Sequence, residues 1–176
     1  MKFEVADAAG TERFARQLAG LLRAGDLVIL SGELGAGKTT FTQSLGAALG
    51  VRPGIISPTF VLVRIHPSLV EGPDLVHVDA YRLASAGEID DIDLENTMDT
   101  AVTVVEWGED RVEHLSDSYL LIRLERPALA PGSDSNLGPD SEEDSEPRTI
   151  ELTAVGPRWA GLDLEAIRLR NENPLG

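Results

Sequence analysis

The spacing of apolar residues predicts alternating helices and strands along the first third of the chain. Residues 11–24 place apolar side chains three and four positions apart, as on one face of a helix, and Thr11 can cap this helix. The unbroken apolar run at 27–30 is typical of a strand buried on both faces of a parallel sheet. Residues 38–49 again show helical spacing, and Gly50 is a suitable terminator. The predicted order is therefore helix, strand, loop, helix.

Further apolar runs, rich in β-branched residues, predict that the sheet continues. They lie at 60–63, 75–78, 101–105 and 119–122. Residues 148–153 are typical of a return strand, which we expect to pair with 119–125 as an antiparallel hairpin, and a closing helix is predicted at 162–170. These elements indicate an α/β fold with a mainly parallel central sheet plus a C-terminal antiparallel hairpin.

The segment 127–147 differs from the rest of the chain in composition. It is rich in Pro, Gly and Ser and carries six carboxylates without a single Lys or Arg. Such a segment cannot bury enough apolar surface to order itself. We expect a flexible, disordered acidic insertion between two strands.

Composition limits the number of domains and the classes of function. With 176 residues, 42% of them apolar, the chain can bury one core, so we expect a single domain over 1–176. A net charge of -15 disfavours direct contact with nucleic acid, and the absence of cysteine excludes disulfides and thiolate metal sites. Neither a secretory segment nor an apolar run of about 20 residues is present, so we expect a cytoplasmic protein without a membrane partner.

Residues 32–39 match the pattern G-x-x-x-x-G-K-[ST] at every fixed position. The matching residues are Gly32, Glu33, Leu34, Gly35, Ala36, Gly37, Lys38 and Thr39. A buried strand precedes the motif and a helix follows it, which is the context that a phosphate-binding loop requires. The glycines allow backbone N–H groups to turn inward around phosphate oxygens at the positive end of the helix. We predict a P-loop that binds the phosphates of a nucleoside triphosphate with Mg²⁺, in a three-layer sandwich like that of P-loop NTPases.

The polar residues of this loop have distinct predicted roles. Lys38 supplies a positive charge to the β- and γ-phosphates, and the Thr39 hydroxyl is placed to ligate Mg²⁺. Thr40 is expected to make a secondary phosphate contact.

Two carboxylates at strand ends are candidates for the metal and the attacking water. Asp79 ends the run 75–78 and Glu106 ends the run 101–105. Open α/β sheets gather their ligands at the carboxyl ends of strands. One acid is expected to hold Mg²⁺ and the other to orient water, and the sequence does not decide which does which.

Residues near these acids are candidates for sensing the nucleotide. Ser57, Pro58 and Thr59 follow the P-loop helix, where nucleotide switches place a hydroxyl that senses the γ-phosphate. Trp107 could cover the nucleotide or belong to the core, and His77 is expected to be packed inside a strand. Arg82, after Tyr81, could clamp a phosphate or form a surface ion pair.

Four motifs occur together in the order and spacing of one known family. They are 31–41, 57–62, 77–83 and 105–108. On these motifs the sequence closely resembles the TsaE family, the small ATPases of bacterial tRNA threonylcarbamoyladenosine biosynthesis. The resemblance runs from about residue 7 to residue 124 and is weak beyond Arg126.

The resemblance implies an ATPase that works on partner proteins. Its expected partners are the threonylcarbamoyl-transferase subunit and the paralogue of that subunit, which modify adenosine 37 of tRNA. The chain would neither transfer the group itself nor contact tRNA except indirectly. Because no Gln or Arg is clearly placed to position water, we expect slow hydrolysis alone and activation by partners.

The resemblance also implies roles for individual residues. Lys38 and its loop look like phosphate ligands, Thr39 and Glu106 like magnesium contacts, and Asp79 like a catalytic or metal-linked acid. Residues 57–59 look like the switch, and Thr11 is expected to touch the nucleotide base. Two departures from the family pattern are Val61, where Thr is common, and Gly108, where Pro often follows Glu-Trp; neither removes a ligand.

Two other functions share the loop and the fold class. A small-molecule P-loop kinase would need an arginine-rich lid, but few arginines follow Glu106 before the insertion, among them Arg111 and Arg123. A GTPase-type switch would need an Asn-Lys-x-Asp segment after a strand, whereas 96–99 lacks the lysine and precedes a strand. The sequence therefore favours adenine and hydrolysis.

Overall fold

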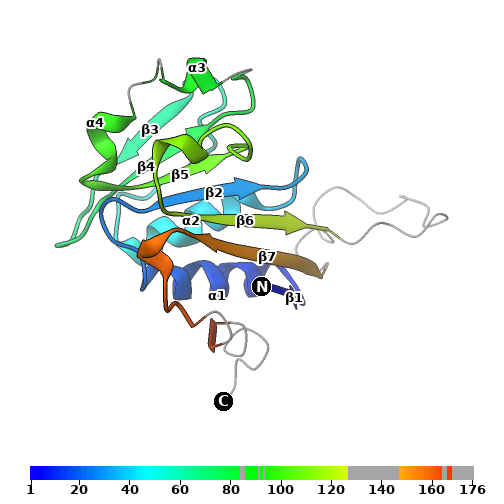
Figure 1. Ribbon diagram of the computed structural model, residues 1–176. Helices are drawn as coiled ribbons and strands as arrows, with labels where there is room; N and C mark the ends of the chain where they lie inside the picture. The colour runs from blue at the N-terminus through cyan, green and yellow to red at the C-terminus, as the bar shows by residue number, and fades with distance from the viewer. Residues whose placement is uncertain (84–85, 91, 93, 127–146, 164–165, 168–176) are drawn as a thin grey trace.

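A mixed sheet of seven strands forms the centre of the described part of the chain (Figure 1). The computed structural model describes residues 1–83, 86–90, 92, 94–126, 147–163 and 166–167. The strands are β1 (Lys2–Val5), β2 (Leu27–Ser31), β3 (Val63–His66), β4 (Asp74–Asp79), β5 (Ala101–Glu106), β6 (Tyr119–Glu125) and β7 (Arg148–Val155). The helices are α1 (Ala8–Ala19), α2 (Lys38–Leu49), α3 (Ala86–Asp90) and α4 (Glu95–Met98), with short 3-10 helices at Glu113–Leu115 and Pro157–Trp159.

The strand order β1-β7-β6-β2-β5-β4-β3 places the parallel strands in the middle of the sheet. The central strands β6, β2, β5 and β4 run parallel, whereas β7 and β1 on one side and β3 on the other are antiparallel to their neighbours. Glu106 is the Cα partner of Leu30 on β2 and of Asp79 on β4. The carboxyl ends of β2, β5 and β4 therefore meet at one edge of the sheet, where the P-loop begins.

Helices α1 and α2 cover one face of the sheet and create the larger of two apolar cores. Phe14 of α1 and Phe41 of α2 are fully buried, with ring centroids 5.9 Å apart, and Phe3 of β1 contacts Phe14 edge-on at 5.4 Å. Burying such aromatic side chains is among the largest apolar contributions to folding. This core fixes α2, and with it the P-loop, against the sheet.

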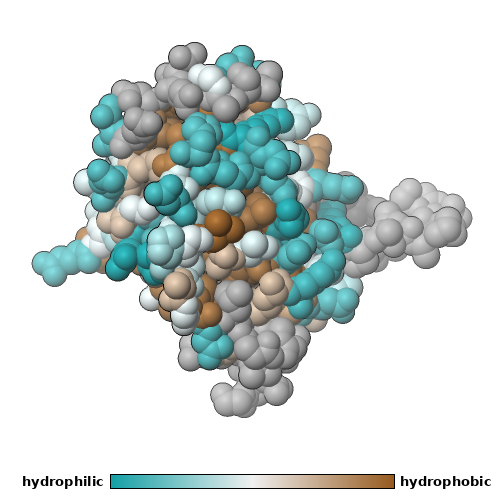
Figure 2. All heavy atoms as spheres, viewed as in Figure 1, coloured by the Kyte–Doolittle hydropathy of each residue, from teal (hydrophilic) through white to brown (hydrophobic). Residues whose placement is uncertain are grey.

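The opposite face of the sheet carries a thinner layer. Ile89 of α3 and Leu94 and Met98, at α4, pack with Ile29 and Val76 of the sheet in a second core. Figure 2, viewed as Figure 1, shows mainly hydrophilic and intermediate residues on the surface, with apolar residues visible in small areas near the middle. Helices therefore lie on both faces of the sheet, and the prediction of a mainly parallel centre is confirmed.

The first helix begins earlier than its apolar spacing predicted. It starts at Ala8, and the side chain of its N-cap Asp7 accepts a hydrogen bond of 2.7 Å from the Gly10 N–H. Thr11 is therefore not the cap but a buried residue inside the first turns. A β-carbon on Gly10 would lie 2.6 Å from Val5 Cβ, so glycine is needed where α1 approaches β1. The prediction missed this start because Ala8 and Gly10 carry little apolar signal.

The structure also corrects the prediction of two strands. The segment 60–63 was predicted as a strand, but β3 starts only at Val63, because the N–H groups of Val61 and Leu62 donate to the Pro58 carbonyl in a turn. Leu62 has a φ of 66°, which is incompatible with an extended strand. Strand β1 was not predicted, because four residues at the chain start give too short a pattern.

The other predictions concern the elements at 27–50 and the C-terminal part of the chain. The strand at 27–30 and the helix at 38–49, ending at Gly50 with a φ of 73°, are confirmed. β7 pairs antiparallel with β6, with Leu124 opposite Ile150. The predicted insertion at 127–147 lies outside the described residues except Pro147, and most of the predicted closing helix at 162–170 lies outside them too. Among the described helices, none combines the length and apolar character needed to cross a bilayer.

Candidate functional site

The loop between β2 and α2 has a backbone conformation that favours glycine. Gly32, Gly35 and Gly37 have φ angles of 142°, 77° and 97°. A β-carbon on Gly32 would lie 2.3 Å from the carbonyl oxygen of Leu124 on β6, so no other residue fits there without a shift. Gly37 is the N-cap of α2, and the positive end of that helix faces the loop. The loop therefore has the shape of an anion cradle.

Lys38 is folded back into this loop. Its Nζ donates hydrogen bonds of 2.7 Å to the Gly32 carbonyl and 2.8 Å to the Glu33 carbonyl, and only 5% of the residue is exposed. The same Nζ lies 3.8 Å from the centroid of the Trp107 ring, a cation–π contact. The ammonium group is thus held at the centre of the loop by groups that a phosphate oxygen could replace.

The environment of Lys38 disfavours its charge. Burial lowers the pKa of the Lys38 ammonium below its usual value, and the carboxylates of Glu106 and Asp79 oppose that shift without cancelling it. An additional negative group beside Nζ would raise the pKa again and favour the charged form. The site is therefore electrostatically suited to an incoming anion.

Glu106, at the end of β5, is held between two hydrogen-bond donors. Thr39 Oγ1 donates to Glu106 Oε1 at 3.1 Å, and His77 Nε2 lies 2.8 Å from the same oxygen. Glu106 is 3% exposed and His77 is fully buried. His77 was expected to be simply packed, but it orients the carboxylate. The sequence held a signal for a role of His77 in the site. Residues two positions apart on a strand point to the same face, so His77 shares a face with Asp79, a predicted site residue.

Asp79, at the end of β4, is tied to the predicted switch. Its Oδ2 accepts hydrogen bonds from Thr59 Oγ1 at 2.6 Å and from Ser57 Oγ at 2.9 Å, and the two hydroxyls lie 2.7 Å apart. Its Oδ1 accepts the Tyr81 N–H at 2.9 Å. The segment 57–59 is therefore coupled directly to a carboxylate that is 3% exposed.

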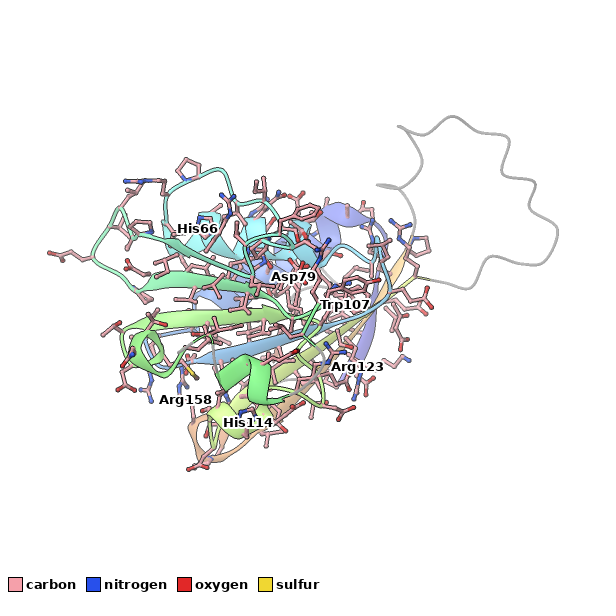
Figure 3. The ribbon with its side chains drawn as sticks, turned by 90° about the horizontal axis from the view of Figure 1, so that it is seen from above. His66, Asp79, Trp107, His114, Arg123 and Arg158 are labelled. Carbon is pink, nitrogen blue, oxygen red and sulfur yellow. The ribbon has the colours of Figure 1, made fainter. Side chains whose placement is uncertain are left out.

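Trp107 stands between these groups and the surface. Its φ of 61° turns the side chain out of β5, while its N–H donates to the Leu30 carbonyl at 2.9 Å. Its ring lies 5.1 Å from that of Tyr81, which is 61% exposed. Figure 3 shows Asp79 and Trp107 close together and well away from Arg158. Arg82 lies over the ring of Phe60 at 4.7 Å, not in the position of a phosphate clamp.

An open cleft of about 490 Å³ collects most of the predicted residues. Those that line it are Leu34, Gly35, Gly37, Lys38, Thr39, Thr40, Ser57, Thr59, Asp79, Glu106 and Trp107. Gly32, Glu33, Ala36 and Pro58 belong to the same loops without lining the cleft. Thr11 does not line it either, because it is buried in α1 with 1% exposure, so the expected contact with the base has no support in this geometry.

Sequence reasoning missed two arginines that line the cleft. Arg126 follows β6 and Arg148 begins β7, and both lie on the P-loop side of the sheet edge. Their positions beside the predicted hairpin could have been noticed, because the end of one strand and the start of its antiparallel partner lie together. The cleft thus has carboxylates on the β4 and β5 side and guanidinium groups on the β6 and β7 side.

Three comparisons place this chain among known proteins. A sequence profile described as "Threonylcarbamoyl adenosine biosynthesis protein TsaE" matches residues 5–130. A Streptomyces coelicolor protein called tRNA threonylcarbamoyladenosine biosynthesis protein TsaE is 50% identical over 153 residues, which cover 86% of this chain and 95% of that protein. A Bacillus subtilis protein of the same name is 31% identical over 97% of this chain and 96% of its own length.

A solved structure extends the likeness to three dimensions. The crystal structure of Bacillus subtilis YdiB superposes with a TM-score of 0.64 at 26% identity, and the match covers all of this chain and 96% of YdiB. The resemblance that the four motifs suggested is therefore confirmed by sequence over most of the chain and by structure. The chain belongs to the TsaE family, whose members are named for tRNA threonylcarbamoyladenosine biosynthesis.

Proposed function

We propose that this protein binds ATP with Mg²⁺ in the cleft and hydrolyses it as a subunit of the machinery that makes N6-threonylcarbamoyladenosine at position 37 of tRNA. The observation that carries the proposal is the convergence of Lys38, Thr39, Glu106 and Asp79, from three segments of the chain, in one cleft. A lysine, a hydroxyl and two acids beside a glycine-rich loop are the parts that phosphoryl transfer needs.

The triphosphate fits the loop by shape and by charge. The positive φ angles of Gly35 and Gly37 turn the backbone around a space at the start of α2, where the helix dipole favours an anion. Lys38 would exchange its carbonyl partners for the β- and γ-phosphate oxygens. Negative phosphate oxygens would favour the charged form of this lysine, whose pKa burial lowers.

The residues at the end of β5 fit a magnesium ion. The Thr39 hydroxyl and the Glu106 carboxylate are oxygen donors already in contact, and Mg²⁺ prefers a few such oxygens together with phosphate oxygens and water. When bound, Mg²⁺ would neutralise charge on the β- and γ-phosphates. His77 keeps Glu106 oriented for this role.

Asp79 is placed to act on water rather than to complete the phosphate cradle. Its two oxygens are held by the hydroxyls of Ser57 and Thr59 and by a backbone N–H, so its carboxylate is fixed at the cleft. Releasing either hydroxyl toward a γ-phosphate would leave Asp79 Oδ2 able to accept a hydrogen bond from water. This coupling makes residues 57–59 a switch between bound and hydrolysed states.

The cycle is proposed to act on partner proteins. The expected partners are the threonylcarbamoyl-transferase subunit and its paralogue, with tRNA contacted only through them. The net charge of -15 supports this arrangement, because it opposes direct binding to a polyanion. The described arginines that line the cleft, Arg126 and Arg148, lie on the β6 and β7 side, across β2 from Asp79 and Glu106, which supports slow hydrolysis alone.

The test is steady-state ATP hydrolysis by the full chain, alone and with the two partner subunits and tRNA. Hydrolysis that is stimulated by the partners and lost in both Lys38→Ala and Glu106→Ala supports the proposal. Phosphate transfer to a small acceptor that needs no partner would overturn it in favour of a kinase, and GTP outcompeting ATP would favour a switch protein.

A further inference from the structure

The two arginines that line the cleft have no part in the function proposed so far. Arg126 and Arg148 come from the ends of β6 and β7, on the opposite side of the P-loop strand β2 from Asp79 and Glu106. They would therefore contact a different part of a bound nucleotide from the part that Asp79 and Glu106 face.

Both guanidinium groups lie against the P-loop itself. A β-carbon on Gly35 would lie 3.5 Å from Arg126 Nη2, and one on Gly37 would lie 4.0 Å from Arg148 Nε. The carbonyl of Leu124, two residues before Arg126, already touches the start of the loop at Gly32. The arginines thus form a wall of the phosphate cradle rather than a distant surface patch.

The two arginines stand at the same end of two paired strands. Glu125 is the Cα partner of Thr149; Arg126 follows the first of these residues and Arg148 precedes the second. Both arginines line the cleft, so they bring positive charge to one side of it in a chain with a net charge of -15. A guanidinium group can donate paired hydrogen bonds to a phosphate.

The direction in which a nucleotide must lie follows from the strand order. The magnesium candidates Thr39 and Glu106, and the Trp107 ring under Lys38, fix the β- and γ-phosphates toward β5 and β4. The α-phosphate must then extend the other way, past the start of α2 toward β6 and β7. That is where the two guanidinium groups lie.

We infer that Arg126 and Arg148 bind the α-phosphate of the nucleotide and so set affinity for ATP and ADP alike. This inference rests on the proposed binding of ATP in the cleft and adds the residues that hold the end of the nucleotide remote from the chemistry. The planar fork of each guanidinium can donate two hydrogen bonds to phosphate oxygens.

The experiment is calorimetric titration of the full chain with Mg-ATP and with Mg-ADP, comparing the natural protein with Arg126→Ala, Arg148→Ala and Arg148→Lys. We expect each alanine variant to weaken ATP and ADP binding by the same factor, about tenfold, because both nucleotides carry the α-phosphate. Arg148→Lys, which keeps the charge and loses the fork, should lose less. Lys2→Ala is the matched control, because it removes a positive charge at an exposed residue outside the cleft.

The outcomes separate this inference from the proposed function. Loss of ATP affinity with unchanged ADP affinity would move the arginines to the γ-phosphate and overturn the assignment. Unchanged affinity for both nucleotides in Arg126→Ala and Arg148→Ala would overturn it while partner-stimulated hydrolysis still stands. A natural protein that binds neither nucleotide would overturn both proposals.

Discussion

Thr39 and Glu106 are joined by a hydrogen bond of 3.1 Å across a separation of 67 residues. One residue opens the P-loop helix and the other ends β5, so the contact exists only because β2 and β5 are parallel neighbours. It brings a hydroxyl and a carboxylate to the same point of the cleft.

Glu106→Gln should preserve the shape of the Thr39 contact and remove the charge. We expect the Mg²⁺ concentration for half-maximal ATP binding to rise by about tenfold or more, because a neutral amide is a poor magnesium ligand. Titration of Mg²⁺ at fixed ATP measures this. His77→Phe should give a smaller shift in the same direction, and equal Mg²⁺ dependence in all three proteins would contradict the assignment.

Thr59→Val should separate binding from hydrolysis. The substitution removes the 2.6 Å hydrogen bond to Asp79 Oδ2 while leaving the P-loop intact. We expect the partner-stimulated kcat to fall by about tenfold or more with little change in the ATP Kd, and Asp79→Asn to lower kcat by about a hundredfold or more. A Thr59→Val variant that loses ATP binding instead would show that residue 59 is a ligand and not a switch.

Trp107 should report nucleotide binding by its fluorescence. The chain has two tryptophans, and Trp159 is buried and does not line the cleft, so Trp159→Phe leaves a single reporter. Binding is expected to draw the Lys38 ammonium from 3.8 Å above the ring toward phosphate and so change the emission. Lys38→Met in the same background should abolish the change, and a signal that persists there would contradict this origin.

Asp26 and Arg158 should contribute to stability away from the site. Arg158 Nε and Nη2 each donate a 2.9 Å hydrogen bond to Asp26, whose side chain is 3% exposed. We expect Asp26→Ala to lower the free energy of unfolding by about 2–4 kcal/mol, because it removes one partner of a largely buried ion pair.

Arg16→Ala is the control for this ion pair. It breaks an exposed ion pair with Glu12 and should change stability by no more than about 0.5 kcal/mol. Urea denaturation measures both variants. Similar losses of unfolding free energy in Asp26→Ala and Arg16→Ala would contradict a special role for Asp26.

His66 should make the protein less stable in mild acid. Burial, with positive charge from His77 and Arg64, lowers the pKa of His66 below its ordinary 6.5. The unfolded chain therefore takes up this proton at higher pH than the folded chain, so the free energy of unfolding should fall as pH drops below about 6.5. Urea denaturation across this pH range should show a shallower fall in His66→Phe. An unchanged pH profile would contradict the assignment.

Local sequence accounts for much of the site. The strand at 27–30 and the helix ending at Gly50 were predicted correctly, because glycine placement and apolar spacing act over a few residues. The strand-end acids Asp79 and Glu106 could also be found, since each ends an apolar run. The start of α1 and the turn at 60–62 were not, because Asp7 capping and the bonds to the Pro58 carbonyl override weak local patterns.

By itself, the sequence determined the glycine-rich loop, the two acids at strand ends and the family, because each is written in a short contiguous motif. Only the tertiary structure decided which of these residues touch. It joined Thr39 to Glu106, Glu106 to His77 and residues 57–59 to Asp79, and it set Arg126 and Arg148 against the glycine-rich loop. The physical reason is that strand order and register, which long-range packing fixes, determine which strand ends become neighbours.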